Sequence, residues 1–210
     1  MAYPLPADVA LKALKDEGVN VHTFGNWKTH NRAGHGSWGP VHGVMLHHTV
    51  TKDTRPSVQL CHDGRPGLPG PLCHGVIDKD GITHMVGWGR TNHAGLGDAQ
   101  VLRSVVKESP LTKPRFNTVD GNSRFYGFEC INLGDGKDPW TESQIDAMVR
   151  VSAALLRAHG WGKQGSTSVI GHKEWQVGKI DPLGPNFPGM DELRNRVQER
   201  LHGKMKMSRP

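Results

Sequence analysis

Long apolar runs are missing from this chain of 210 residues, of which 35% are hydrophobic. A helix that crosses a membrane needs about 20 consecutive apolar residues, so we expect no membrane insertion. The segment Met1 to Pro6 has neither the basic region nor the apolar region of a secretory signal peptide. We therefore expect a protein that is made in the cytosol.

Cysteine is also scarce. The 3 cysteines, Cys61, Cys73 and Cys130, are odd in number and form no CxxC pair. They exclude a four-cysteine zinc site, and without a signal peptide they disfavour a disulfide framework. A cysteine peptidase, with Cys61 or Cys73 activated by a histidine, is an alternative. Neither sequence context is typical of a nucleophile.

The excess of positive charge is small, a net +6, and it is spread along the chain. The one basic cluster lies in the tail 203–210, and no basic run alternates with aromatic residues, which make up 6% of the chain. Nucleic-acid binding therefore rests on net charge alone and is not expected. An anionic cell envelope fits the charge as well, and so does simple solubility.

Glycine and proline are abundant, with 27 and 14 residues, which is typical of a loop-rich mixed domain. Predicted strands alternate with predicted helices, which indicates an α/β fold, with a central mixed sheet flanked by helices in a single domain. We expect a helix and loop extension at 1–40, the catalytic domain at 41–202 and a basic tail at 203–210. We expect a monomer.

Apolar periodicity locates the individual elements. It predicts strands at 44–50, 75–78, 82–86, 125–133 and 169–170. It predicts helices at 7–17, 141–159 and 190–201. Polar, Gly-rich and Pro-rich composition predicts loops at 18–40 and 52–72. Thr141 should cap the second helix, with Gln144 completing a capping box.

Histidine is the residue type that stands out, with 13 in the chain. A zinc hydrolase needs three protein ligands of N, O or S type and leaves a fourth position to water. Such a set is offered by His47 or His48, His172 and Asp181. Because these ligands would come from separate elements, their spacing is weak evidence, and histidines scattered over the surface are the alternative.

The two adjacent histidines differ in the strand face on which they lie. Side chains alternate along a strand, so His48 shares a face with the apolar Val44 and Leu46. That face should be the packed one, which would leave His47 facing a cleft. His47 is therefore the better candidate for a ligand, and we expect His48 to be a buried histidine satisfied by a hydrogen bond.

Two further residues could take part in hydrolysis. Glu129 lies within a predicted strand and shares its face with Gly127, which should leave open space before the carboxylate. Near a metal, Glu129 could act as general base for water, although an exposed edge-strand carboxylate is an equal alternative. Lys179 lies two residues before Asp181 and could stabilise a negatively charged oxygen, if the metal site exists.

At these residues the chain resembles the type-2 N-acetylmuramoyl-L-alanine amidase family, which includes phage lysozyme-like amidases, muropeptide amidases and peptidoglycan-recognition proteins. Six segments match in the family's order across residues 40 to 190. They are Val44-Met45-Leu46-His47-His48-Thr49, Cys73-His74-Gly75-Val76-Ile77-Asp78-Lys79-Asp80-Gly81, Asn92-His93-Ala94-Gly95, Tyr126-Gly127-Phe128-Glu129, Gly171-His172-Lys173-Glu174-Trp175 and Lys179-Ile180-Asp181-Pro182.

The resemblance implies hydrolysis of the amide between N-acetylmuramic acid and L-alanine in peptidoglycan, with Zn²⁺ held by His47, His172 and Asp181. It implies that Glu129 acts on the attacking water and that Lys179 stabilises the oxyanion. His93 matches a histidine beside the family's site, and we expect it to contact the substrate or a zinc ligand.

Two segments are less typical of the family, since neither roughly the first 40 residues nor the insert at 97–122 has a counterpart. The insert should border the cleft, where it could tune substrate choice. The lead-in at 38–43, Trp-Gly-Pro-Val-His-Gly, resembles endolysin amidases that act on actinobacterial walls. We therefore expect a phage endolysin that reaches the cell wall once the membrane is permeabilised. The alternative is a module of the same fold that binds peptidoglycan without cutting it.

Overall fold

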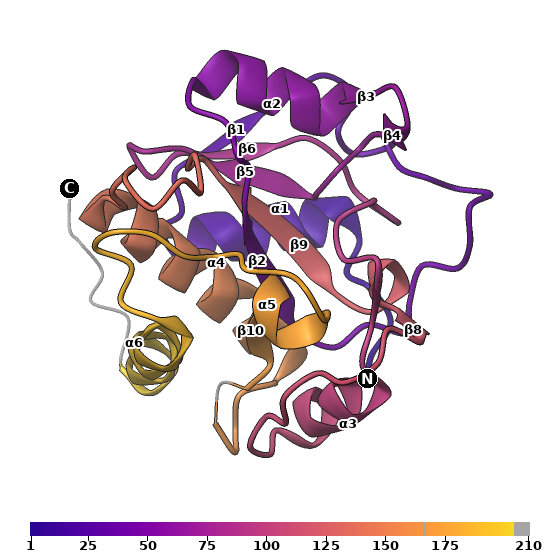
Figure 1. Cartoon of the computed structure of the whole chain (residues 1–210), viewed down its shortest axis with the longest axis vertical. Coiled ribbons are helices and arrows are strands. Elements are labelled where there is room, and N and C mark those ends of the chain that lie inside the picture. Colours follow the sequence, from indigo (N-terminus) through magenta and orange to yellow (C-terminus); the bar gives the residue numbers. More distant parts are fainter. Residues whose placement is uncertain (166, 204–210) are drawn as a thin grey trace.

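The computed structural model describes residues 1–165 and 167–203, so the predicted basic tail lies outside the described residues from residue 204 on. A six-stranded sheet forms its centre, in the order β1-β6-β5-β9-β2-β10 (Figure 1). The strands are β1 (Val21–Thr23), β2 (Val44–His48), β5 (Gly75–Ile77), β6 (Thr83–Met85), β9 (Tyr126–Cys130) and β10 (Val169–Gly171). The β5–β6 pair is antiparallel and the other pairs are parallel, so the sheet is mixed, as predicted.

Helices and short elements complete the chain. The helices are α1 (Ala7–Asp16), α2 (Thr54–Asp63), α3 (Ala99–Lys107), α4 (Glu142–His159), α5 (His172–Trp175) and α6 (Met190–His202), with a 3₁₀ turn η1 (Gly121–Ser123). Two small ribbons pair β3 (Gly64–Arg65) with β4 (Leu68–Pro69) and β7 (Leu96–Gly97) with β8 (Val119–Asp120).

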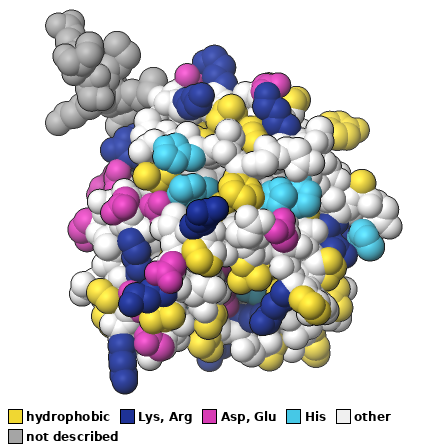
Figure 2. Space-filling view, turned by 90° about the horizontal axis from the view of Figure 1, so that it is seen from above, with side chains coloured by type: hydrophobic (Ala, Val, Ile, Leu, Met, Phe, Trp, Pro, Cys, Tyr) yellow, Lys and Arg dark blue, Asp and Glu magenta, His cyan; other side chains and the backbone are white. Residues whose placement is uncertain are grey.

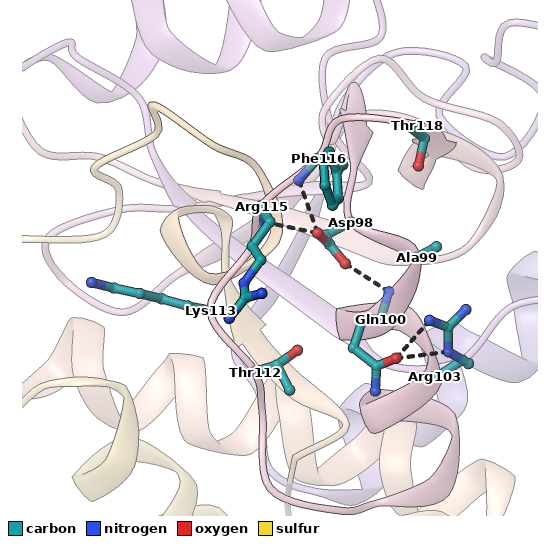
Figure 3. A pocket seen from close by; sticks show the side chains of 9 residues that line it. All are labelled: Asp98, Ala99, Gln100, Arg103, Thr112, Lys113, Arg115, Phe116 and Thr118. Atoms are coloured by element: carbon teal, nitrogen blue, oxygen red, sulfur yellow. Dashed lines mark hydrogen bonds between the residues drawn. The ribbon is translucent and has the colours of Figure 1, made fainter.

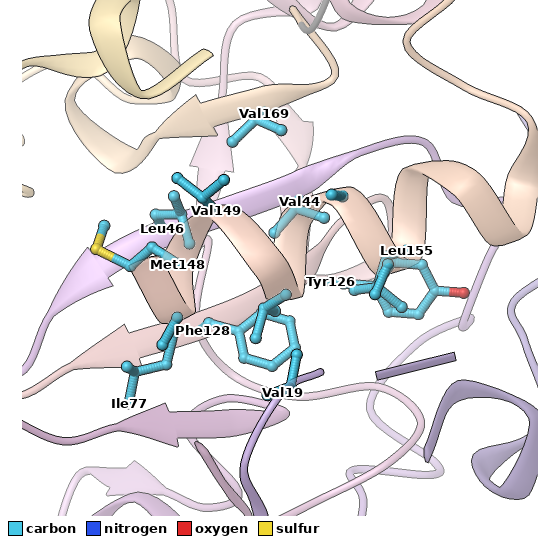
Figure 4. Packing of buried hydrophobic residues seen from close by; sticks show 14 of the residues in the cluster. Val19, Val44, Leu46, Ile77, Tyr126, Phe128, Met148, Val149, Leu155 and Val169 are labelled. Atoms are coloured by element: carbon cyan, nitrogen blue, oxygen red, sulfur yellow. The ribbon is translucent and has the colours of Figure 1, made fainter. Parts of the chain in front are cut away.

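One face of the sheet is covered by α4, which has α1 and α6 packed at its sides (Figure 1). The start of α4 is capped as predicted, since Thr141 Oγ1 accepts a hydrogen bond from the Gln144 N–H at 3.1 Å. Val44 and Leu46 of β2 pack with Phe128 and with Met148 of α4 in the main core (Figure 4). Each such side chain contributes about 1.5–3 kcal/mol when fully buried, which fixes this face of β2 inward.

The opposite face carries the chemistry. Here α2 packs over β5 through Val58 and Cys61, and α5 packs near α3 through the buried Trp175. Val76, Glu129 and His47 lie side by side on this face, because they occupy matching positions of β5, β9 and β2. The sheet thus presents Glu129 and His47 between the α2 cluster and the α3–α5 cluster.

Three of the sequence predictions were wrong in detail. Residues 52–72, predicted as loop, contain α2 and the β3–β4 ribbon, and residues 18–40 contain β1. Pro56 did not prevent α2, because it lies in the first turn, where a backbone N–H has no helical partner. Gln144 does not complete a capping box: its side chain is buried and donates to the carbonyl oxygens of Ile77 and Ile131 at 3.2 and 3.0 Å.

The N-terminal residues are tied to the rest of the fold. The Leu5 N–H donates to the Tyr126 hydroxyl at 2.8 Å, and the Trp88 indole N–H donates to the Leu5 carbonyl at 2.7 Å. None of the helices within the described residues combines the length and apolarity that membrane crossing requires. On the face seen in Figure 2, acidic and basic side chains are interspersed and do not gather into one basic patch.

Candidate active site and metal centre

The three predicted ligands meet on the open face of the sheet. His47 Nδ1 lies 3.0 Å from His172 Nδ1, and Asp181 Oδ2 lies 3.2 Å from each of these nitrogens. All three residues are buried. Within residues 1–165 and 167–203, this is the group of histidine, cysteine and carboxylate side chains that could hold a metal ion.

Strand register explains why the two histidines are neighbours. Leu46 pairs with Gly171 across the parallel β2–β10 ladder, so His47 and His172 follow at the same level of adjacent strands. Gly171 also lets the third ligand come close, because a Cβ there would lie 2.8 Å from Cδ of Pro182. The Asp181 carbonyl accepts a hydrogen bond from the Lys173 N–H at 2.8 Å, which fixes the returning loop.

The donor set fits zinc in kind and in spacing. Two imidazole nitrogens and one carboxylate oxygen are ordinary ligands of catalytic zinc, and bonds of about 2.0–2.1 Å in a tetrahedron would separate ligand atoms by about 3.3 Å. The observed separations are 3.0 to 3.2 Å. The donor atoms therefore already have nearly the spacing that the metal requires.

The protonation states also suit a cation. Burial lowers the pKa of His47 to about 4, so its ring is neutral and can offer a lone pair. Burial opposes ionisation of Asp181, but its close contacts with the rings of His172 and His47 outweigh this effect and hold the pKa of that carboxyl well below its usual range. Asp181 thus carries a negative charge beside the neutral ring of His47.

His93 lies behind His47, as part of a hydrogen-bonded chain that orients the ligand. His93 Nε2 donates to the Phe125 carbonyl at 3.2 Å, so His93 Nδ1, in a neutral ring, accepts from His47 Nε2 at 3.1 Å. Burial, followed by the neighbouring His47, lowers the pKa of His93 well below its usual value, which keeps that ring neutral. The lone pair of His47 Nδ1 must then point toward His172 and Asp181.

Gly127 makes room for this arrangement. A Cβ at Gly127 would lie 2.3 Å from Nδ1 of His93. The prediction that Gly127 leaves open space before Glu129 was therefore wrong, because the His93 ring occupies that space. We expected His93 to contact either the substrate or a zinc ligand, and its hydrogen bond with the candidate ligand His47 favours the second.

Gln176 supports the second histidine and was not found from the sequence. Its Oε1 accepts a hydrogen bond from His172 Nε2 at 3.0 Å, which leaves His172 Nδ1 free to face Asp181. The two residues are four apart, a spacing that brings side chains together on a helical turn. That spacing was the one available signal, but it is too common to single out a residue.

Glu129 faces the same site with an unsatisfied oxygen. Its Oε2 is buried and has no hydrogen-bond partner in the described part of the chain. Burial and the charge of Asp181 raise the pKa of Glu129 to about 8, against a smaller opposite effect of Lys179. A buried carboxyl oxygen without a partner is costly, so this oxygen is available to pair with a water molecule or a substrate group.

Lys179 and His48 are the two remaining candidate residues from the sequence. Lys179 is exposed, and its charge reaches Glu129 and His47, since it lowers the pKa of both. His48 lies on the other side of β2, where a Cβ on Gly134 would lie 2.6 Å from its Nε2. Its Nδ1 is buried without a hydrogen-bond partner in the described residues, so the expected hydrogen bond is not seen at that atom.

The cysteines do not form a nucleophilic centre. All three are buried and free. Burial raises the pKa of the Cys73 and Cys130 thiols, so both remain protonated at neutral pH. A cysteine that attacks a carbonyl needs the opposite shift, toward the thiolate.

Comparison with known proteins agrees with this geometry. A family model described as N-acetylmuramoyl-L-alanine amidase matches residues 37–184. None of the curated proteins matches the chain.

Several solved structures share the fold. The endolysin amidase LysCS from Clostridium intestinale URNW is 18% identical, with a TM-score of 0.56 over 84% of this chain and 94% of that one. AmpDh3 from Pseudomonas aeruginosa, solved in complex with anhydromuramic pentapeptide, is 19% identical, with a TM-score of 0.53 over 79% and 63%. The hydrolase AmiA from Staphylococcus aureus, solved with its ligand, is 13% identical, with a TM-score of 0.52 over 96% and 95%.

Proposed function

Because the chain belongs to the N-acetylmuramoyl-L-alanine amidase family, we propose that it hydrolyses the amide between N-acetylmuramic acid and L-alanine in peptidoglycan in a zinc-dependent reaction. The observation that carries this proposal is the meeting of His47 Nδ1, His172 Nδ1 and Asp181 Oδ2 beside the unsatisfied Glu129 carboxylate.

In this proposal His47, His172 and Asp181 hold the zinc ion. When bound, zinc lowers the pKa of a water molecule and polarises the carbonyl of the scissile amide. The His93 chain and Gln176 hold the two ligand rings in the tautomers that ligation needs, so no proton has to move before the metal binds.

Glu129 moves the proton. The pKa of Glu129, about 8 in the chain alone, would fall beside a bound divalent cation toward the range in which this residue can take and return a proton. Glu129 removes a proton from the attacking water and then delivers it to the nitrogen of the leaving L-alanine. The Lys179 ammonium stabilises the negative charge on the carbonyl oxygen during the attack.

The biological setting is a further part of the proposal. We take the protein to be a phage endolysin, because the lead-in at 38–43 resembles endolysin amidases that act on actinobacterial walls. Purified protein should then degrade isolated actinobacterial walls and lyse permeabilised cells. Failure on every intact wall, with soluble fragments still cleaved, would count against the endolysin role and leave the amidase activity in place.

Digestion of purified peptidoglycan, with and without a chelator, tests the activity. We expect chelator-sensitive release of free L-alanine N-termini without new reducing sugars, and one zinc ion per chain by elemental analysis. Glu129→Gln should keep the zinc ion but lower turnover by about 10²–10⁴-fold, the usual contribution of a general acid–base. Retention of peptidoglycan without cleavage would instead support a binding module, and full activity of Glu129→Gln would remove this residue from its role.

A further inference from the structure

A cavity of about 450 Å³ lies in the 97–122 insert, between the first turn of α3 and the segment 112–118 (Figure 3). Three cationic side chains, Arg103, Lys113 and Arg115, line it, together with the carboxylate of Asp98 and the ring of Phe116. The cavity is separate from the His47, His172 and Asp181 cluster, and no step of the proposed reaction uses it.

Asp98 joins the two walls of the cavity by hydrogen bonds. Oδ1 of Asp98 accepts hydrogen bonds from the N–H groups of Gln100 and Val101 in α3, at 2.6 and 3.3 Å. Oδ2 accepts from the N–H groups of Arg115 and Phe116, at 2.7 and 2.9 Å. Four backbone donors therefore satisfy this carboxylate, as Figure 3 shows for three of them.

The cations that line the cavity are left without a counter-ion. Arg103 donates to the neutral Oε1 of Gln100 at 3.0 and 2.6 Å, and it has no ion pair within the described residues. The side chains of Lys113 and Arg115 have no hydrogen-bond or ion-pair partner in that part of the chain either. Three cations around a prebuilt cavity favour an anionic ligand, and a guanidinium favours a carboxylate or a phosphate.

The position of the cavity relates it to the candidate active site. The Asp98 N–H donates to the Trp175 carbonyl at 3.1 Å, and Asn117 Oδ1 accepts from the Val177 N–H at 3.0 Å. Val177 follows Gln176, which orients His172. The exposed Val177 and Phe116 give an apolar surface at this junction, which suits the methyl groups of a peptide better than a phosphate polymer.

We propose that this cavity binds a free carboxylate of the peptide part of peptidoglycan, which makes Arg115 and Lys113 determinants of substrate affinity. The proposal rests on the proposed function, since it takes peptidoglycan as the substrate. The peptide would extend from the scissile amide past Val177 and place its carboxylate beside the Arg115 guanidinium, with Lys113 adding positive charge at the rim of the cavity.

Binding of a defined peptide tests this proposal apart from hydrolysis. The probe is L-Ala–γ-D-Glu–meso-diaminopimelate–D-Ala, titrated calorimetrically into the whole zinc-loaded chain, with a second peptide whose carboxylates are amidated. Arg115→Glu should lower the affinity for the free acid about tenfold, the effect of losing one charge-assisted hydrogen bond. It should not change the affinity for the amidated peptide, and Lys113→Glu should act in the same direction.

Lys15→Glu is the matched control. It makes the same change in net charge at an exposed residue of α1, the helix that packs against α4 on the other face of the sheet. The fold of the insert should survive Arg115→Glu, because Arg115 contacts Asp98 through its backbone N–H. We expect less than a twofold effect of Lys15→Glu on binding of the free acid.

Three results of the binding experiment would overturn the inference. One is unchanged affinity in Arg115→Glu and Lys113→Glu; another is an equal loss in Lys15→Glu, which would show a general charge effect. The third is Arg115-dependent binding of a glycerol phosphate oligomer with no such dependence for the peptide. If Arg115→Glu cleaves muropeptides with an unchanged KM, this inference is refuted and the proposed function remains intact. If the peptide binds in an Arg115-dependent way but the protein cleaves nothing, the proposed hydrolysis alone is refuted.

Discussion

Replacing Gly127 by alanine should weaken zinc binding, although the residue touches no ligand. The added Cβ would lie 2.3 Å from Nδ1 and 2.4 Å from Cγ of His93, closer than atoms of a folded protein approach. The ring of His93 must therefore leave its position, and His47 Nε2 loses the acceptor that fixes its tautomer. Loss of such a contact behind a ligand usually lowers metal affinity about 10–100-fold, or about 1.4–2.8 kcal/mol.

A double-mutant cycle isolates this effect. His93→Ala removes the same acceptor and should lower zinc affinity by the same factor, but it also empties the space that the new Cβ needs. The double variant Gly127→Ala/His93→Ala should therefore bind zinc as His93→Ala does. The loss of zinc-binding free energy in the double variant should thus be smaller than the sum of the two single losses by about 1.4–2.8 kcal/mol, which is the whole effect of one substitution.

Zinc affinity would be measured by competition with a chromophoric chelator, alongside urea unfolding of the metal-free chains. Gly75→Ala is the control, because its Cβ would lie 2.8 Å from Cε1 of Phe128, in the core on the opposite face. It should lower the free energy of unfolding by about 1–3 kcal/mol and leave zinc affinity unchanged. Additive effects in the cycle, or unchanged affinity in Gly127→Ala, would refute the role that we assign to His93.

Three further predictions concern the stability of the fold. Burial lowers the pKa of His74 from 6.5 to about 4. As the pH falls below 6.5, His74 therefore becomes protonated in the unfolded chain before it does in the folded chain. The free energy of unfolding should fall by up to about 3 kcal/mol between pH 6.5 and pH 4 for this reason. Urea unfolding at a series of pH values measures this slope, and His74→Gln should flatten it; an unchanged slope would contradict the assignment. Val50 has a φ of 57°, which is unfavourable for a β-branched residue. Val50→Asn should therefore raise the free energy of unfolding by about 1 kcal/mol. A lower free energy of unfolding would show that the contacts of the valine side chain outweigh this backbone strain. Asp98→Ala should destabilise the chain by about 3 kcal/mol, because four backbone donors lose their acceptor; a loss below about 1 kcal/mol would mean that water replaces it.

The elements that the sequence predicted correctly are those whose periodicity comes from the core. The strand at 44–50 and the hairpin at 75–86 were predicted because their turns and apolar alternation are local features, and α4 because its apolar stripe is long. Helix α2 was missed because its window is polar and followed by a segment rich in Gly and Pro. Its helical form depends on Val58 and Cys61 packing onto β5, which is a tertiary contact.

The candidate site, like the fold, could be predicted from the sequence only in part. His47, His172 and Asp181 could be predicted, because zinc accepts few side-chain types and the chain resembles a family that uses them. The atoms through which His93 and Gln176 support these ligands could not be predicted. His93 reaches His47 only because Gly127, on a strand that begins 33 residues later, leaves room for the ring. No local pattern at His93 or at Gln176 shows which atom each will contact.

The choice of His47 over His48 shows how the core determines the chemistry. Val44 and Leu46 are buried against Phe128 and α4, so the intervening positions of β2 must face the opposite side. A shift of the β2 register by one residue would exchange the two faces, present His48 to Asp181 and bury His47 among apolar side chains. Such a shift would also put Val44 and Leu46 on the open face, at a cost of about 1.5–3 kcal/mol for each. The apolar residues Val44 and Leu46 of β2 therefore decide which histidine joins the candidate metal site, although they lie on the opposite face of the sheet.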